Sequence, residues 1–234
     1  MVIKLQLHKI SILLGIIICL LSMLYVQPYC AREVLRREPT SLRTLIIDAG
    51  HGGADGGAVG IDGTPESPIN WQIAIKLQSL SKLCGIPIVM TRNSETIDYP
   101  SDATTISEKK ISDQQARLRL IRDYPNGILY SIHQNAYPNK SISGLHVLYG
   151  HNESSRNLGN LLQSQFNEFL SDKSRRVAAE ISDDIYLMRN CECTAVLIEC
   201  GFISNSTDCK LLQTDTHQKK LAVIMLGGYL QFLN

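Results

Sequence analysis

The chain has 234 residues, of which 44% are hydrophobic and 19% are charged, and its formal net charge is +1. This length is enough for one domain with a substantial core. The near-neutral charge provides no bulk electrostatic field that would attract nucleic acid or an acidic polymer, so we expect no nucleic-acid partner. Any partner therefore has to be inferred from a local site.

Residues 1–31 predict a membrane anchor or signal segment. The apolar run "ISILLGIIICLLSMLYVQPYCA" meets no charge until Arg32, and about 20 apolar residues are enough to span a bilayer. The bulky Tyr29 stands where cleavage after Ala31 would need a small residue, which favours an uncleaved anchor. Residues 32–42 are expected to be a charged linker and 43–234 the globular domain. Basic residues on both sides leave the orientation open, and we expect the domain outside the cytoplasm.

Strands alternate with helices along the rest of the chain. The run "RTLIIDAG" at 43–50 is typical of a buried strand. A helix follows, with Ser67 as the expected cap, Pro68 in the first turn and Gly85 beyond the end. The pattern then predicts a strand at 86–92, a long polar loop at 93–111 that would form a lid or site wall, a helix at 112–124, strands at 127–136 and 144–149, a helix at about 154–171, strands near 185–188 and 194–199, and a final helix from about 216.

This alternation predicts an α/β fold with a mostly parallel sheet flanked by helices on both faces. In an open sheet of this kind, ligands bind outside the carboxyl ends of the strands. Two histidines fall there, because His51 follows the first strand and His133 lies near the end of the strand at 127–136. Either histidine alone would more often be structural. Two at equivalent strand ends favour a site.

Two glutamates complete a candidate hydrolytic site. Zinc in a catalytic site takes three protein ligands and leaves a position for water, and two histidines with one carboxylate are a common set. Glu66 is the natural third ligand beside His51 and His133, although it could simply favour the positive end of the following helix. Glu199 ends the apolar strand "TAVLIE" at the same rim, and there it could act as a general base on the attacking water, or be only a solvated strand-end residue.

The loop between Gly50 and Gly60 contains the densest run of glycines in the chain. No Gly-Lys-Ser/Thr follows it, so a phosphate-binding loop of the P-loop type is not expected. We expect instead that the glycines let the backbone turn beside His51 and leave room for a bulky substrate. Asp48 and Asp55 either orient the ligands or act as turn residues.

The remaining histidines and cysteines give weaker signals. His146, His151 and His217 are expected to be surface or packing residues. The "CEC" stretch at 191–193 has no second thiol or imidazole pair at a zinc-finger distance, so free or core cysteines are expected.

The chain resembles the zinc-dependent N-acetylmuramoyl-L-alanine amidases whose sequences open with an Asp-x-Gly-His-Gly-Gly stretch. The resemblance runs from about Thr44 to the C terminus and rests on six motifs in the family's order: "IIDAGHGGADGGAVG", "ESPIN", "MTR", "ARLRLI", "SIHQNA" and "AVLIECGFISN". By position, it implies that His51, Glu66 and His133 are the zinc ligands and that Glu199 is the catalytic glutamate. It also implies a twisted sheet of about six strands between helices.

The resemblance implies hydrolysis of the amide between the muramic acid lactyl group and L-alanine of the peptidoglycan stem peptide. The small sporulation amidases, which remove peptides from spore cortex and so permit muramic-δ-lactam formation for germination, have a similar layout. Some relatives need an activating protein partner. Two other functions stay open from the residues: a zinc peptidase that cuts within the stem peptide, and a non-catalytic wall-binding protein.

Overall fold

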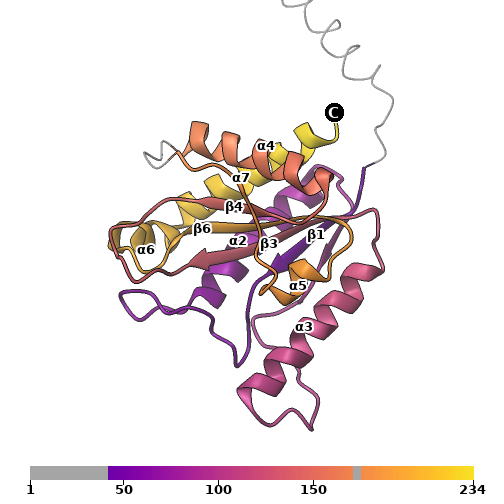
Figure 1. Ribbon diagram of the computed structural model, residues 1–234, viewed down its shortest axis with the longest axis vertical. Helices are drawn as coiled ribbons and strands as arrows, with labels where there is room; N and C mark the ends of the chain where they lie inside the picture. The colour runs from indigo at the N-terminus through magenta and orange to yellow at the C-terminus, as the bar shows by residue number, and fades with distance from the viewer. Residues whose placement is uncertain (1–41, 171–174) are drawn as a thin grey trace, which may run out of the picture. The chain divides into compact units, whose positions relative to one another are not determined.

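The computed structural model describes residues 42–170 and 175–234. The predicted anchor at 1–31 and the linker up to residue 41 lie outside the described residues. Within the described residues, a six-stranded sheet has the order β2-β1-β3-β6-β4-β5 (Figure 1). The strands are β1 (Leu45–Ala49), β2 (Ile88–Met90), β3 (Ile128–Asn135), β4 (His146–Tyr149), β5 (Ala179–Glu180) and β6 (Thr194–Phe202).

The sheet is mostly parallel, as predicted. β1 pairs in parallel with β2 and β3, and β3 pairs in parallel with β6. The exception is β4, which runs antiparallel to β6. The carboxyl ends of β1, β3 and β6 therefore meet at one edge of the sheet.

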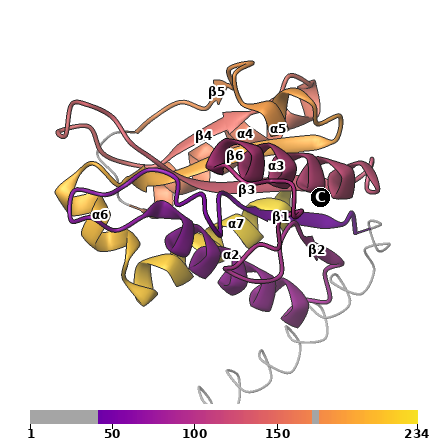
Figure 2. The same ribbon diagram turned by 90° about the horizontal axis from the view of Figure 1, so that it is seen from below.

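Helices cover both faces of the sheet, which confirms the predicted fold class. They are α2 (Glu66–Leu83), α3 (Ile106–Arg122), α4 (Glu153–Phe169), α5 (Tyr186–Arg189), α6 (Ser206–Leu212) and α7 (Asp215–Phe232). In Figure 2, α2 and α7 lie below the sheet and α3 lies above it. None of the helices within the described residues combines the length and apolar character that crossing a membrane requires.

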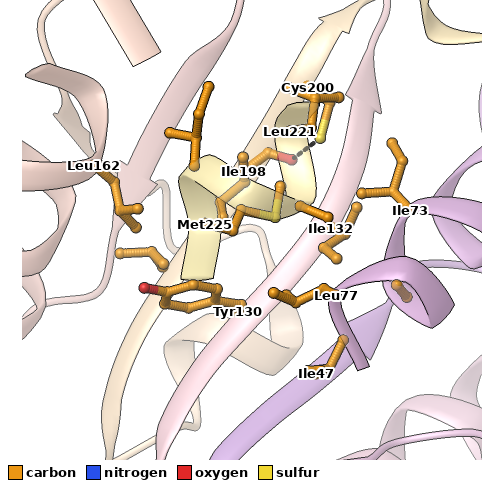
Figure 3. Close-up of a cluster of buried hydrophobic side chains, with 14 of the residues drawn as sticks. Ile47, Ile73, Leu77, Tyr130, Ile132, Leu162, Ile198, Cys200, Leu221 and Met225 are labelled. Atoms are coloured by element: carbon orange, nitrogen blue, oxygen red, sulfur yellow. Dashed lines mark hydrogen bonds between the residues drawn. The ribbon is translucent and has the colours of Figure 1, made fainter. Parts of the chain in front are cut away.

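The larger core lies between the sheet and the helices α2, α4 and α7. Figure 3 shows Ile47, Tyr130 and Ile198 from three strands packed against Leu77 of α2 and Met225 of α7. A smaller core lies on the other face, where Leu118 of α3 and Met188 of α5 pack against alternate strand residues such as Leu129. Because side chains alternate along a strand, the two cores draw on complementary sets of strand residues.

The predicted polar loop at 93–111 is too long, because α3 begins at Ile106 and not at residue 112. Thr105 accepts a hydrogen bond from the backbone N–H of Glu108, and the Glu108 carboxylate accepts one from the backbone N–H of Thr105. This reciprocal capping box satisfies N–H groups that a helix start leaves free. Its Thr-x-x-Glu signature is present in the sequence but lacks an apolar run behind it.

Two other local predictions need correction, and one helix was not predicted. The predicted strand near 185–188 is the short helix α5, in which the consecutive residues Leu187 and Met188 are both buried, against the alternation of a strand. Helix α6 was not predicted. Helix α2 starts at Glu66, with Pro65 at its cap position and Ser67 inside the first turn. Carbonyl groups of the glycine loop, rather than a side chain, accept from the first N–H groups of α2.

Candidate metal and catalytic site

A cleft of about 540 Å³ opens at the carboxyl ends of β1, β3 and β6. Lys110 and Gln114 of α3 form part of one wall, and Tyr186 and Leu187 of α5 form part of another. The lining includes all of the sequence-predicted site residues: His51, Glu66, His133 and Glu199.

His51, Glu66 and His133 converge in this cleft. Each offers one nitrogen or oxygen atom, and the three atoms all lie within 4.8 Å of one another. Oε1 of Glu66 lies 3.2 Å from Nε2 of His51 and 3.1 Å from Nδ1 of His133. The two rings stand edge to face, with centroids 5.0 Å apart. Residues far apart in the chain thus present three donor atoms to a common point.

The backbone at His51 takes a conformation that few side chains adopt. Its φ is +58°, and Gly52 and Gly53, which follow, also have positive φ. A Cβ at Gly57 would overlap the side chains of Glu66 and His51. We expected the glycines to leave room for a bulky substrate. At Gly57, the missing side chain instead leaves room for the side chains of Glu66 and His51.

Asp55 orients the ring of His51. Oδ2 of Asp55 lies 2.8 Å from Nδ1 of His51, so Nδ1 carries the proton and Nε2 faces Glu66. Burial lowers the pKa of His51, but hydrogen bonds to Asp55 and Glu66 outweigh this and raise it to about 9. A metal ion that bonds to Nε2 has to displace a proton, so metal binding should weaken as the pH falls.

Glu66 is held from two sides. Its Oε2 accepts a hydrogen bond from the backbone N–H of Ala58 at 2.9 Å, and its Oε1 accepts from Nδ2 of Asn70 at 3.1 Å. The side chain is only 3% exposed. Burial raises the pKa of Glu66, but hydrogen bonds to His133 and His51 lower it well below its usual range. The carboxylate is thus ionised and fixed, as a metal ligand requires.

A buried ion pair fixes the turn that carries His51. Nη1 of Arg117 donates to Asp48 at 2.8 Å and to the carbonyl of Ala49 at 2.7 Å, and Nη2 donates to the carbonyl of His51 at 2.6 Å. Burial raises the pKa of Asp48, but Arg117 and hydrogen bonds from Ser131 and Thr91 lower it to about 2. Asp48 therefore supports the site through Arg117 rather than by contacting a histidine.

Sequence reasoning did not identify Arg117, Arg92 or Asn70 as site residues. Arg92 donates to the carbonyl of Ala49 at 3.0 Å and lies over the ring of Trp71. All three residues occur inside the quoted motifs "ARLRLI", "MTR" and "ESPIN". The charge or amide of these side chains was the available signal in the sequence. Each of them also donates to a backbone carbonyl, a kind of partner that no sequence pattern marks.

Glu199 lies beside the three converging residues. It is the register partner of His133 on the neighbouring strand, so both side chains lie on the same face of the sheet. Its Oε2 is buried and has no hydrogen-bond partner among the described residues. Burial raises the pKa of Glu199 to about 7. A buried carboxylate without a partner at the wall of a cleft is suited to exchanging protons near neutral pH.

A family model for N-acetylmuramoyl-L-alanine amidases matches residues 45–228 of the chain. The chain belongs to this amidase family. The predicted enzyme class and the resemblance are thereby confirmed. Members of the family are generally zinc-dependent, and the three converging residues supply the site at which an amidase of this family could hold a metal ion.

Individual relatives agree with this assignment. The germination-specific N-acetylmuramoyl-L-alanine amidase of Bacillus subtilis is 31% identical over 195 residues, which is 83% of this chain and 81% of the relative. The structure of the CwlD amidase from Clostridioides difficile in complex with the GerS lipoprotein matches with a TM-score of 0.77 and 32% identity, over 82% of this chain and 98% of that one. The amidase AmiC2 of Nostoc punctiforme, at 22% identity and a TM-score of 0.70, shares the fold.

The donor set of this amidase fits zinc. Tetrahedral zinc with bonds of about 2.0–2.1 Å separates its ligand atoms by about 3.3 Å. The observed contacts of Glu66 with His51 and His133, at 3.2 and 3.1 Å, are close to this separation. Two histidine nitrogens and one carboxylate oxygen would fill three of the four positions of a tetrahedral zinc ion. The fourth position stays open for water, as in hydrolytic zinc sites.

The other histidines lie outside the cluster. His146 contacts the carbonyl of Val177, and His151 contacts the carboxylates of Glu180 and Asp183 at the surface. Burial lowers the pKa of His217, which lines a separate pocket near α6. None of the three is part of the one metal-type group found among the described residues.

Proposed function

We propose that the chain is a zinc-dependent amidase that hydrolyses the bond between the N-acetylmuramoyl lactyl group and L-alanine of the peptidoglycan stem peptide. The observation that carries this proposal is the convergence of His51, Glu66 and His133 beside the partnerless carboxylate of Glu199. Membership of the amidase family supplies the substrate class.

In this proposal, His51, Glu66 and His133 hold the zinc ion. When bound, zinc polarises the scissile carbonyl and lowers the pKa of a water molecule. Asp55 keeps the proton of His51 on Nδ1, which leaves Nε2 free to bind. Glu199 takes the proton of the attacking water and then gives it to the departing nitrogen of L-alanine. Its raised pKa, about 7, suits both steps at neutral pH.

Product analysis on purified peptidoglycan tests this activity. We expect intact stem peptides with a new free amine on L-alanine, activity lost on treatment with a chelator, and activity restored by zinc. Shortened stem peptides would show a zinc peptidase instead. Peptidoglycan binding without any product, by protein that contains zinc, would show a wall-binding protein.

We further propose a role in spore cortex, where removal of the peptide would precede muramic-δ-lactam formation for germination. The germination-specific relative in Bacillus subtilis supports this role. Muropeptide analysis of spores that lack the protein should show a loss of muramic-δ-lactam. Spores with a normal lactam content would contradict the role in cortex but would leave the amidase activity standing.

The proposed location is outside the cytoplasm, with residues 1–31 as the membrane anchor and 43–234 as the amidase domain. Cell-wall amidases among the relatives support action on the outer side. A protein partner that strengthens zinc binding is also part of the proposal, supported by the Clostridioides difficile amidase that was solved in complex with a lipoprotein. Fractionation of the full chain and of a chain that starts at residue 43 tests the anchor, since only the full chain should sediment with membranes.

A further inference from the structure

Two cysteines that the proposed reaction does not use lie in contact in the segment between α5 and β6. Cys191 follows α5, and Cys193 precedes β6. Their Sγ atoms are 3.1 Å apart. A disulfide bond is about 2.05 Å long, so the sulfur atoms need to approach by only about 1 Å to form one.

The other described cysteines lack such a contact with a thiol. Sγ of Cys200 contacts the carbonyl of Ile198, and Sγ of Cys209 contacts the amide of Gln213. Cys84 is exposed beyond the end of α2. The pair at 191 and 193 therefore differs from the rest of the described cysteines by its geometry and not only by its spacing.

We infer that Cys191 and Cys193 form a redox-active dithiol that closes to an intramolecular disulfide when the chain meets a disulfide oxidant. The oxidant is a small-molecule disulfide or a thiol–disulfide oxidoreductase. Two electrons pass from the two thiols to the oxidant's disulfide. One S–S bond breaks in the oxidant and one forms in the chain, and the oxidant leaves as two thiols that carry the two protons.

The two cysteines differ in a way that assigns each a step. Cys191 is partly exposed, so its sulfur can attack the external disulfide and form a mixed disulfide. Cys193 is buried beside it, and its Sγ lies 3.1 Å from the Sγ of Cys191. The Cys193 thiolate is thus placed to attack the sulfur of Cys191 and release the second thiol.

The position of the pair gives the disulfide a structural consequence. The backbone N–H of Cys191 donates to the carbonyl of Met188 in α5, while Cys193 packs in the smaller core. Tyr186 and Leu187 of the same short helix line the cleft. Closing the disulfide therefore fixes the junction between this cleft wall and the strand that carries Glu199.

Oxidation of the full chain with oxidised glutathione, followed by alkylation of free thiols, tests the inference. Cleavage of the peptide bond after Glu192 separates the two cysteines. We expect the two fragments to stay joined in oxidised protein and to come apart after reduction. The mixed disulfide on Cys191 should not accumulate in the wild type.

Variants distinguish a dithiol from two independent cysteines. Cys193→Ala, which keeps a small apolar side chain in the core, should leave a stable glutathione adduct on Cys191. Cys84→Ser should leave the joined fragments unchanged. The inference would be overturned if oxidised wild-type protein gave separate alkylated fragments, or if it kept the glutathione adduct on Cys191 as the Cys193→Ala variant does.

Discussion

The two faces of the sheet are stabilised in different ways. On the face covered by α2, α4 and α7, strand residues such as Ile47, Tyr130 and Ile198 pack into one apolar core. On the opposite face, which carries the smaller apolar core, the same strands present Asp48 and Ser131 and, near their carboxyl ends, His133 and Glu199. There, hydrogen bonds and ion pairs replace apolar contact as the sheet approaches the cleft.

This difference shows how one sheet can be both a scaffold and a site. The apolar face gains stability in proportion to the area removed from water and needs no directional contact. The polar face keeps ionised groups out of bulk water, so each of them needs a partner at a defined distance. Substitutions on the polar face should therefore change metal binding, activity and pH response, whereas substitutions on the apolar face should change stability alone.

The largest effect is expected from His133→Ala. Loss of one of three donors should abolish firm zinc binding and reduce activity by on the order of 10³-fold or more, because several kcal/mol of Lewis-acid assistance are lost. Zinc content and amidase rate measure this, with circular dichroism to verify folding. The matched control is His151→Ala, a surface histidine outside the cluster, which should retain zinc. Equal zinc content in the two variants would remove His133 from the ligand set.

The next largest effect is expected from Arg117→Ala. The substitution leaves Asp48 buried without its partner and should cost about 3–5 kcal/mol in the free energy of unfolding. It should also weaken zinc binding, because the carbonyl of His51 loses its donor. Arg119→Ala, on the exposed side of α3, is the control and should stay within about 0.5 kcal/mol of wild type. Denaturant unfolding distinguishes them, and equal stabilities would contradict the role of the ion pair.

The apolar face is probed by Leu77→Ala. Leu77 is 0% exposed in α2, and its truncation should cost about 3 kcal/mol by leaving a cavity. Leu83→Ala, in the same helix at 84% exposure, should be nearly neutral. Zinc affinity per folded molecule should be unchanged in both. A Leu77→Ala variant that folds fully and yet loses zinc would contradict the claim that substitutions on the apolar face change stability alone.

The smallest effect is a pH dependence that belongs to the polar face. The pKa of Asp48 is lowered to about 2 in the folded chain, so its contribution to stability is present above the unfolded pKa, near 4, and is lost as the pH falls toward 2. That contribution is about 2 kcal/mol. Denaturant unfolding of wild type and Asp48→Asn should therefore show a stability difference that shrinks as the pH falls from about 4 to about 2. A constant difference would contradict this account of the pair.

The sequence predicts the strands of the sheet better than it predicts the residues that hold the site residues in place. The apolar run at 194–199 identifies a buried strand, although the shorter run near 185–188 forms the helix α5. Histidines at strand ends can be located because parallel strands end together. Arg117 could not be assigned in this way, because its partners include the carbonyls of Ala49 and His51. The start of α3 was missed because a polar helix with a capping box lacks the apolar periodicity that predicts helices.

The central claim is that Glu199 moves protons while His51, Glu66 and His133 hold the metal. Replacing Glu199 by Gln keeps the shape of the side chain but removes its ability to accept a proton. Zinc content and turnover on peptidoglycan, measured on one preparation, test the claim most directly. We predict about one zinc ion per chain, as in the wild type, with turnover reduced by roughly 10²–10⁴-fold. Glu199→Gln protein that retained both its zinc and most of its activity would contradict the claim.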